Sequence, residues 1–124
     1  MPKVLVIPVD VTEPIRIETL TNWEAYQSLV GGWIESAPVD RDDLSLFINE
    51  EGKVMNLPRN SRADDLWRNL LPSGRIPGDY IAGTAVVVGF DATTGADADV
   101  PDSIVADLLP QTGLPTLGEP VPTT

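Results

Sequence analysis

Two apolar runs, at residues 3–9 and 80–90, constrain the fold of this 124-residue chain more than any other feature. The first run is continuous in aliphatic and β-branched residues over the length of one strand, which indicates a strand buried on both faces of a sheet. The second contains Gly83 and Gly89, and glycine in a strand often marks a bulge or a close backbone approach. With 42% hydrophobic residues, the chain is expected to form one domain with its own core.

Shorter segments with strand or helix periodicity surround these runs. Strands are predicted over residues 15–20, 33–39, 44–49 and 53–57, and helices over residues 23–30, 63–71 and 102–109. Thr21 or Asn22 is expected to cap the first helix, and Gly31 with Gly32 to end it. The order of elements predicts an α+β fold, a single mixed, mostly antiparallel sheet of five to six strands covered by two to three short helices.

Residues 1–110 are expected to form a single compact α+β domain. Residues 111–124 are rich in proline and glycine and hold too little apolar surface to offset the entropy of ordering, so we expect a mobile tail there. Residues 91–99 are predicted to be a loop.

The charge is strongly acidic, with 19 acidic and 8 basic residues and a formal net charge of −11. Such a charge disfavours nonspecific binding to nucleic acid or to an anionic membrane. We therefore expect no direct nucleic-acid binding and no membrane association, and the short first run, broken by Pro8, is expected to be a strand of a cytoplasmic protein. Basic partners, or a surface that imitates nucleic acid, remain open.

The chain contains neither cysteine nor histidine. The usual thiol nucleophile, the usual general base at neutral pH and the commonest metal ligand are thus all missing. We expect a protein that is not an enzyme and that has no cofactor and no metal site. A hydrolase that uses carboxylates alone, for example Glu35 with Asp79 or Glu50, is the least favoured alternative.

Residues 44–62 hold the densest set of polar side chains. They predict a hairpin with Gly52 in the left-handed conformation at its turn, followed by entry into a helix capped by Asn60 or Ser61. The candidate ligand- or partner-binding residues at the ends of this hairpin are Asn49, Glu50, Glu51, Arg59, Asn60 and Arg62.

Two interpretations of this set are open. In the structural interpretation the asparagines form local turn and cap hydrogen bonds, and the arginines pair with nearby carboxylates. In the functional interpretation Arg59 and Arg62, scarce cations in an acidic chain, bind a carboxylate or a phosphate.

Two acidic groups and three tryptophans are further candidate sites. The aspartates do not continue into a calcium-loop pattern, so solvated acidic loops are favoured; they are Asp40, Asp42, Asp43, Asp97, Asp99 and Asp102. Trp23 and Trp67 lie at apolar positions of predicted helices, which favours core packing. Trp33 is the tryptophan whose exposure would suggest a binding surface.

Three segments carry a family resemblance: LVGGWIE at residues 29–35, FINEEGKVMNLPRN at residues 47–60 and IAGTAVVVG at residues 81–89. With the first apolar strand, they resemble a small phage and bacterial mobile-element family known only as a domain of unknown function. The resemblance implies a compact α+β domain encoded among phage or plasmid accessory genes, some of them near antirestriction functions. It implies no catalytic residue.

We therefore expect a non-enzymatic accessory protein that acts by binding a protein partner, in its most concrete version as an acidic inhibitor of a nucleic-acid-binding host protein. That version predicts a contiguous acidic face from residues 40–43, 64, 65 and 91–107. The alternative is a protein that binds a small anionic ligand such as a nucleotide through Arg59 and Arg62, with Arg68 or Arg75. A homodimer through an exposed edge of the residue 44–57 hairpin is a further expectation.

Overall fold

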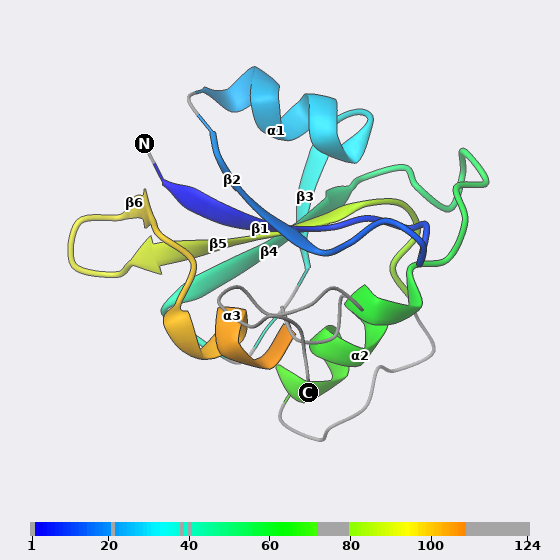
Figure 1. Ribbon diagram of the computed structural model, residues 1–124. Helices are drawn as coiled ribbons and strands as arrows, with labels where there is room; N and C mark the ends of the chain where they lie inside the picture. The colour runs from blue at the N-terminus through cyan, green and yellow to red at the C-terminus, as the bar shows by residue number, and fades with distance from the viewer. Residues whose placement is uncertain (1, 21, 38, 40, 72–79, 109–124) are drawn as a thin grey trace.

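The computed structural model describes residues 2–20, 22–37, 39, 41–71 and 80–108. These residues form one antiparallel sheet with helices on both faces, which confirms the predicted α+β fold (Figure 1). The elements, in chain order, are β1 (Lys3–Ile7), β2 (Arg16–Thr19), α1 (Trp23–Val30), β3 (Ile34–Ala37), β4 (Leu44–Asn49), α2 (Ser61–Asn69), β5 (Ala85–Asp91), β6 (Ala96–Ala98) and α3 (Asp102–Leu108).

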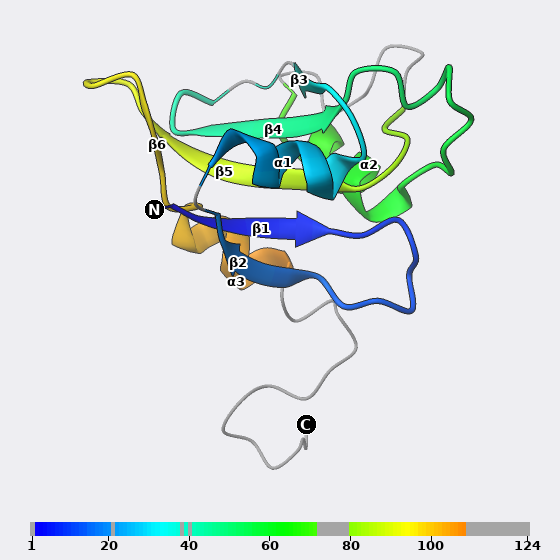
Figure 2. The ribbon, with the colours of Figure 1, turned by 90° about the horizontal axis from the view of Figure 1, so that it is seen from above.

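The two apolar runs supply neighbouring strands in the middle of the sheet. The strand order is β2-β1-β5-β4-β3, and β6 pairs antiparallel with the C-terminal end of β5. Helix α1 covers one face, while α2 and α3 cover the other (Figures 1 and 2). Val4 and Val6 pack in the cluster that contains Tyr26 of α1, whereas Leu5 packs in the cluster that contains Trp67 of α2. Both faces of β1 are therefore buried, as its continuous apolar sequence predicts.

Three predicted helix caps are confirmed, although α2 spans Ser61–Asn69 and not residues 63–71. The side chain of Asn22 accepts a hydrogen bond from the Ala25 N–H at 2.9 Å, and Gly31 ends α1 in the left-handed conformation with a φ of 87°. Asn60 caps α2 through the Ala63 N–H at 3.0 Å. The alternative cap Thr21 lies outside the described residues.

The predicted second strand of the hairpin, at residues 53–57, is wrong. Residues 51–56 form consecutive turns, and the left-handed residue is Asn56, with a φ of 57°, while Gly52 has no positive φ. Gly52 is needed for a different reason, because a Cβ there would lie 2.6 Å from the carbonyl oxygen of Ala82. The hairpin does not offer the expected exposed edge, since β4 lies between β5 and β3 and the outer strand on this side of the sheet is β3. The homodimer itself stays a prediction.

Two further predictions need correction beside β5. Residues 80–84 are not part of a strand, apart from a bridge between Ala82 and Arg59, and residues 96–98 of the predicted loop form β6. Gly89 does mark a close backbone approach, because a Cβ there would collide with the carbonyl group of Asp99. The expected mobile tail at residues 111–124 lies outside the described residues. Among the described residues there is no helix with the length and apolar character needed to cross a membrane.

Candidate functional site

Asn60 joins three parts of the fold and is fully buried. Its side-chain Nδ2 donates to the carbonyl oxygens of Ile7 at 2.9 Å and Gly83 at 3.0 Å, while its Oδ1 caps α2. The end of β1, the start of α2 and the segment before β5 are thereby held together. Every polar atom of this side chain has a partner within the fold, so Asn60 positions neighbouring residues and does not face a ligand.

Arg59 is held against the same segment. Its Nε lies 2.6 Å from a carboxylate oxygen of Asp64, whose other oxygen accepts the Ile81 N–H at 2.7 Å. The Arg59 guanidinium also lies over the ring of Tyr80, 5.1 Å from the ring centroid. This arrangement fixes Tyr80 at the surface beside α2.

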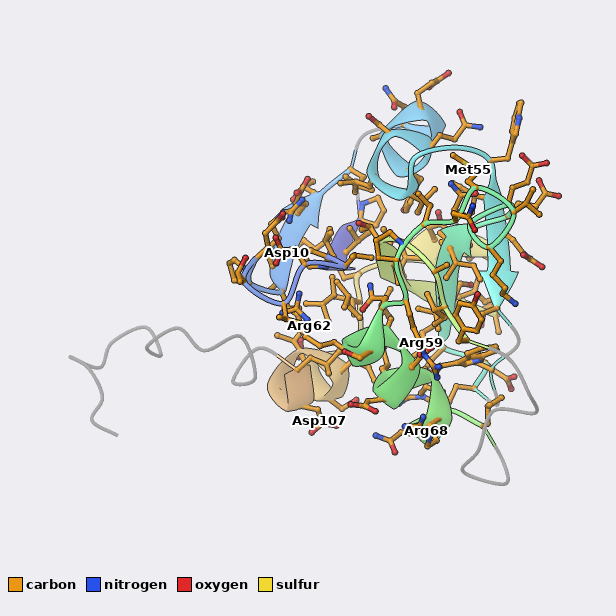
Figure 3. The ribbon with its side chains drawn as sticks, turned by 90° about the vertical axis from the view of Figure 1, so that its right-hand side faces the viewer. Asp10, Met55, Arg59, Arg62, Arg68 and Asp107 are labelled. Atoms are coloured by element: carbon orange, nitrogen blue, oxygen red, sulfur yellow. The ribbon has the colours of Figure 1, made fainter. Side chains whose placement is uncertain are left out.

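Arg62 contacts a different element. Its Nη2 donates to the carbonyl oxygens of Pro8 at 2.8 Å and Asp10 at 3.0 Å, at the turn that follows β1. Figure 3 shows Arg62 near Asp10, whereas Arg59, which precedes α2, lies apart from it. The two arginines predicted to converge on an anion are therefore each engaged within the chain. Arg68, the third candidate, pairs with Asp65 at 2.8 Å, and Arg75 lies outside the described residues.

Asn49 ties the turns after β4 to the end of α1. Its Oδ1 accepts the Glu51 N–H at 2.7 Å, and its Nδ2 donates to the Val30 carbonyl at 3.1 Å and lies 3.8 Å from Met55 Sδ. The neighbouring Glu50 N–H donates to the Trp33 carbonyl at 2.8 Å. Trp33 and Met55 are thus brought to one corner of the molecule around a buried amide.

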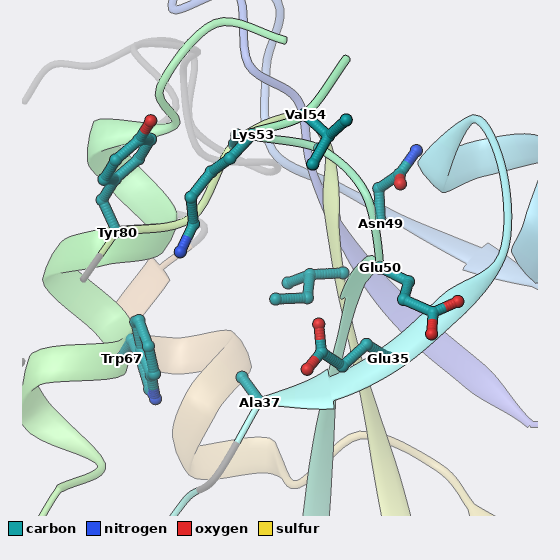
Figure 4. Close-up of a pocket in the computed structure, with 11 residues that line it drawn as sticks. Glu35, Ala37, Asn49, Glu50, Lys53, Val54, Trp67 and Tyr80 are labelled. Carbon is teal, nitrogen blue, oxygen red and sulfur yellow. The ribbon is translucent and has the colours of Figure 1, made fainter. Parts of the chain in front are cut away.

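A pocket of about 300 Å³ opens at this corner, between the β3–β4 side of the sheet and α2 (Figure 4). Ala37 and Ile48 form an apolar floor, and Trp67 contributes a wall from α2. The other lining residues are Glu35, Asn49, Glu50, Gly52, Lys53, Val54, Tyr80 and Ala82. Two predicted site residues, Asn49 and Glu50, line this pocket, while Arg59, Asn60 and Arg62 do not.

The pocket combines charged groups with apolar surface. The Nζ of Lys53 lies 5.1 Å from the centroid of the Tyr80 ring, and Glu35 extends its carboxylate from β3 toward the space in front of Trp67 (Figure 4). Glu35 and Glu50, considered as a carboxylate pair from the sequence, line the same pocket, whereas Asp79 lies outside the described residues. Carboxylates beside apolar walls suit a cationic group carried on an aliphatic stem.

Large apolar side chains are exposed next to the pocket. Trp33 is 67% exposed, Val54 82% and Met55 50%. Trp33 directly precedes β3, one of the two outer strands of the sheet, so exposed apolar side chains border an edge strand here. Such a combination is typical of protein-interaction surfaces.

The predicted acidic face is interrupted. Asp64 is buried and serves the Arg59 and Ile81 contacts, and Asp65 pairs with Arg68 on α2. Asp43 is hydrogen-bonded to Arg41, which holds the pKa of that carboxyl below its usual value. Within the described ranges no group of three or more acidic side chains is arranged to hold a metal ion, and Asp40 lies outside them.

Comparison with known proteins identifies one family. Its sequence profile, described as DUF3846, a domain of unknown function, matches residues 2–112. No curated protein and no solved structure matches the chain.

Proposed function

This chain belongs to the DUF3846 family, a domain of unknown function, and from that premise we propose that it is a non-enzymatic protein that binds a protein partner at one corner of its sheet. We call this surface the β3 corner and define it by Trp33, β3, Glu50, Val54 and Met55. The observation that carries the proposal is the coincidence of an edge strand with three exposed apolar side chains.

The coincidence is informative because natural proteins usually protect their edge strands and bury their large apolar side chains. Edge strands offer unpaired backbone groups to other chains, and natural proteins normally surround them with charge or cover them. Burial of a tryptophan and a methionine side chain is favourable by roughly 1.5–3 kcal/mol each, and tryptophan is among the residues that dominate binding energy at protein interfaces. A partner that covers the β3 corner can pair with the edge strand and also bury these apolar side chains.

The acidic charge supports a basic partner. Glu35, Glu50 and Glu51 are exposed at the corner, where Lys53 is the neighbouring cation. We propose, more specifically, a cytoplasmic accessory protein of a phage or mobile element that inhibits a nucleic-acid-binding host protein by covering a basic surface on it. Electrostatic attraction of this kind accelerates association and weakens as salt is added.

A pull-down from cells that express the protein tests the proposal. The bait is the tagged full chain, used as wild type, Trp33→Ser and Met55→Asp at low and high salt. The matched control is Val11→Asp, because Val11 is 63% exposed in the turn after β1, outside the β3 corner. We expect one set of proteins to be captured by the wild type and the control, lost with both corner variants and reduced by salt. Equal capture by all four baits would contradict the proposal.

A further inference from the structure

Building on the proposed function, we propose that the partner binds by strand addition. An extended, basic segment of the partner pairs with the outer side of β3 and places a lysine or arginine side chain in the pocket beside Glu35.

The backbone of β3 is arranged for this pairing. Ile34 lies opposite Asn49 in the register, so Trp33 lies opposite Glu50, whose N–H donates to the Trp33 carbonyl. Because backbone groups alternate in direction along an antiparallel strand, those of Glu35 also face β4, and those of Ile34 and Ser36 face outward. In the part of the chain that the structure describes, no segment pairs with that outer side.

The side chains on β3 determine which residue of the segment reaches the pocket. In an added antiparallel strand, the residue opposite Glu35 belongs to a non-hydrogen-bonded pair, in which Cα atoms are about 4.5 Å apart and side chains are closest. Glu35 lines the pocket on the α2 side of the sheet, together with Ala37 and Trp67 (Figure 4). The opposing side chain therefore points to the same side, toward the mouth of the pocket.

The chemistry of the pocket selects a basic side chain. The apolar floor of Ala37 and Ile48 suits an aliphatic stem, and the Glu35 carboxylate suits an ammonium or guanidinium tip.

The same charges argue against a second copy of this chain as the occupant. Two β3 edges of this chain, brought together, would set Glu35 of one copy near Glu35 of the other, and each copy carries a net charge of −11. Like charges opposite each other destabilise strand pairing. A basic segment of another protein satisfies both the edge and the pocket.

The test begins with random peptides displayed on phage and selected on the immobilised full chain. We expect the enriched peptides to carry lysine or arginine at alternate positions and to bind as synthetic peptides in calorimetry. In amide hydrogen exchange by NMR, the Ile34 and Ser36 amides should become protected on peptide binding, because they donate to the added strand. This protection is specific to strand addition.

Two variants probe the mode of binding. Ser36→Pro removes an outward N–H and leaves the β3–β4 bonds intact, which an edge strand tolerates, and should weaken peptide binding by about tenfold or more. Glu35→Gln should weaken binding of basic peptides in particular. The matched control is Thr19→Pro on β2: Leu20 donates to the Pro2 carbonyl, so the backbone groups of Thr19 face outward on the opposite edge of the sheet. The Thr19→Pro variant should bind the peptide as tightly as the wild type does.

Several results would overturn the inference. They are the absence of any enriched peptide, enrichment of peptides without basic residues, unprotected Ile34 and Ser36 amides, or dimerisation of the chain that Ser36→Pro abolishes. If Ser36→Pro does not fold, the amide protection and Glu35→Gln decide the question. The proposed function is tested separately: capture of the cellular partner that is lost with Trp33→Ser but kept with Ser36→Pro would leave that function standing and refute strand addition.

Discussion

Arg59 and Asp64 form an ion pair in which one member is at the surface and the other in the core: the Arg59 side chain is 57% exposed and that of Asp64 only 3%, with Nε and Oδ2 2.6 Å apart. The same carboxylate accepts the Ile81 N–H. Asp64 thereby connects α2 to the segment that carries Tyr80, a wall of the pocket. Arg59, through its contact with Asp64, thus helps to hold the pocket wall formed by Tyr80 in place.

Loss of the Asp64 carboxylate should therefore destabilise the whole domain. In Asp64→Ala the buried Ile81 N–H loses its acceptor, and a buried donor without a partner costs about 1–3 kcal/mol. We expect the free energy of unfolding, measured by urea denaturation with tryptophan fluorescence, to fall by about 2–3 kcal/mol.

Asp65→Ala is the matched control on the same helix. Asp65 is 74% exposed in its ion pair with Arg68. Removal of such a surface pair should change the unfolding free energy by less than about 1 kcal/mol. Equal effects of the two substitutions would show that the Asp64 contacts contribute little.

Asn60→Ala should cost more than the loss of an ordinary helix cap. A cap is worth about 1 kcal/mol, but Asn60 also donates to the buried carbonyls of Ile7 and Gly83. We expect a decrease of about 3 kcal/mol in the unfolding free energy by urea denaturation. Asn22→Ala, which removes the exposed cap of α1, is the control and should cost only about 1 kcal/mol. A similar loss in both variants would refute the bridging role of Asn60.

The sequence predicts the centre of the fold better than its corner. The continuous apolar runs identify β1 and β5, and Gly31 identifies the end of α1, because these signals are local. Residues 53–57 alternate like a strand, yet Val54 and Met55 are exposed, because Gly52 packs on Ala82 and the chain turns at Asn56. Those contacts join segments about thirty residues apart, and hydrophobic periodicity, which is local, does not predict them.

The candidate site was predictable in part for the same reason. Asn49 and Glu50 stand out from the sequence as a polar turn, and both line the pocket. Trp67 and Tyr80 do not stand out, since their position beside the turn depends on α2 and on the Asp64 contacts. Trp33 was predictable as a candidate whose exposure would suggest a binding surface, and it is exposed at the corner.

Gly52→Ala tests whether the turns after β4 are held by close packing. The added Cβ would lie 2.6 Å from the Ala82 carbonyl oxygen, so one of the two backbones must move. Overpacking of this kind costs about 1–3 kcal/mol, and we expect the unfolding free energy to fall by that amount. Gly95→Ala is the control: its Cβ would meet nothing within 4 Å, although its φ of 76° carries a cost of about 1–2 kcal/mol.

The packing effect should also appear in the backbone amide signals of the segments that meet at Gly52. NMR shifts of residues 50–55 and 80–83 should change in Gly52→Ala and stay as in the wild type in Gly95→Ala. Unchanged shifts in Gly52→Ala would mean that this glycine is not required for close approach.

Tyr26 should make the protein sensitive to alkaline pH. Burial, with the nearby Asp97 carboxylate as the second cause, raises the pKa of Tyr26 from 10.0 to about 12. The unfolded chain therefore releases this proton before the folded chain does, so the stabilisation is complete below about pH 10 and is lost as the pH rises toward about 12. Over that window the residue should lower the unfolding free energy by about 1.4 kcal/mol per pH unit.

Tyr26→Phe isolates this effect, because it removes the phenol and keeps the edge-to-face contact with Phe47, whose ring centroid lies 5.4 Å away. Urea unfolding should be measured at several values between about pH 9 and about pH 12 for the wild type, Tyr26→Phe and the control Tyr80→Phe, which retains Tyr26. We expect stability to decline less steeply in Tyr26→Phe than in the other two proteins. Parallel declines in all three proteins would mean that groups other than Tyr26 cause the alkaline sensitivity. The position of the Tyr26 hydroxyl, on α1 beside Asp97 of β6, would then not keep it neutral.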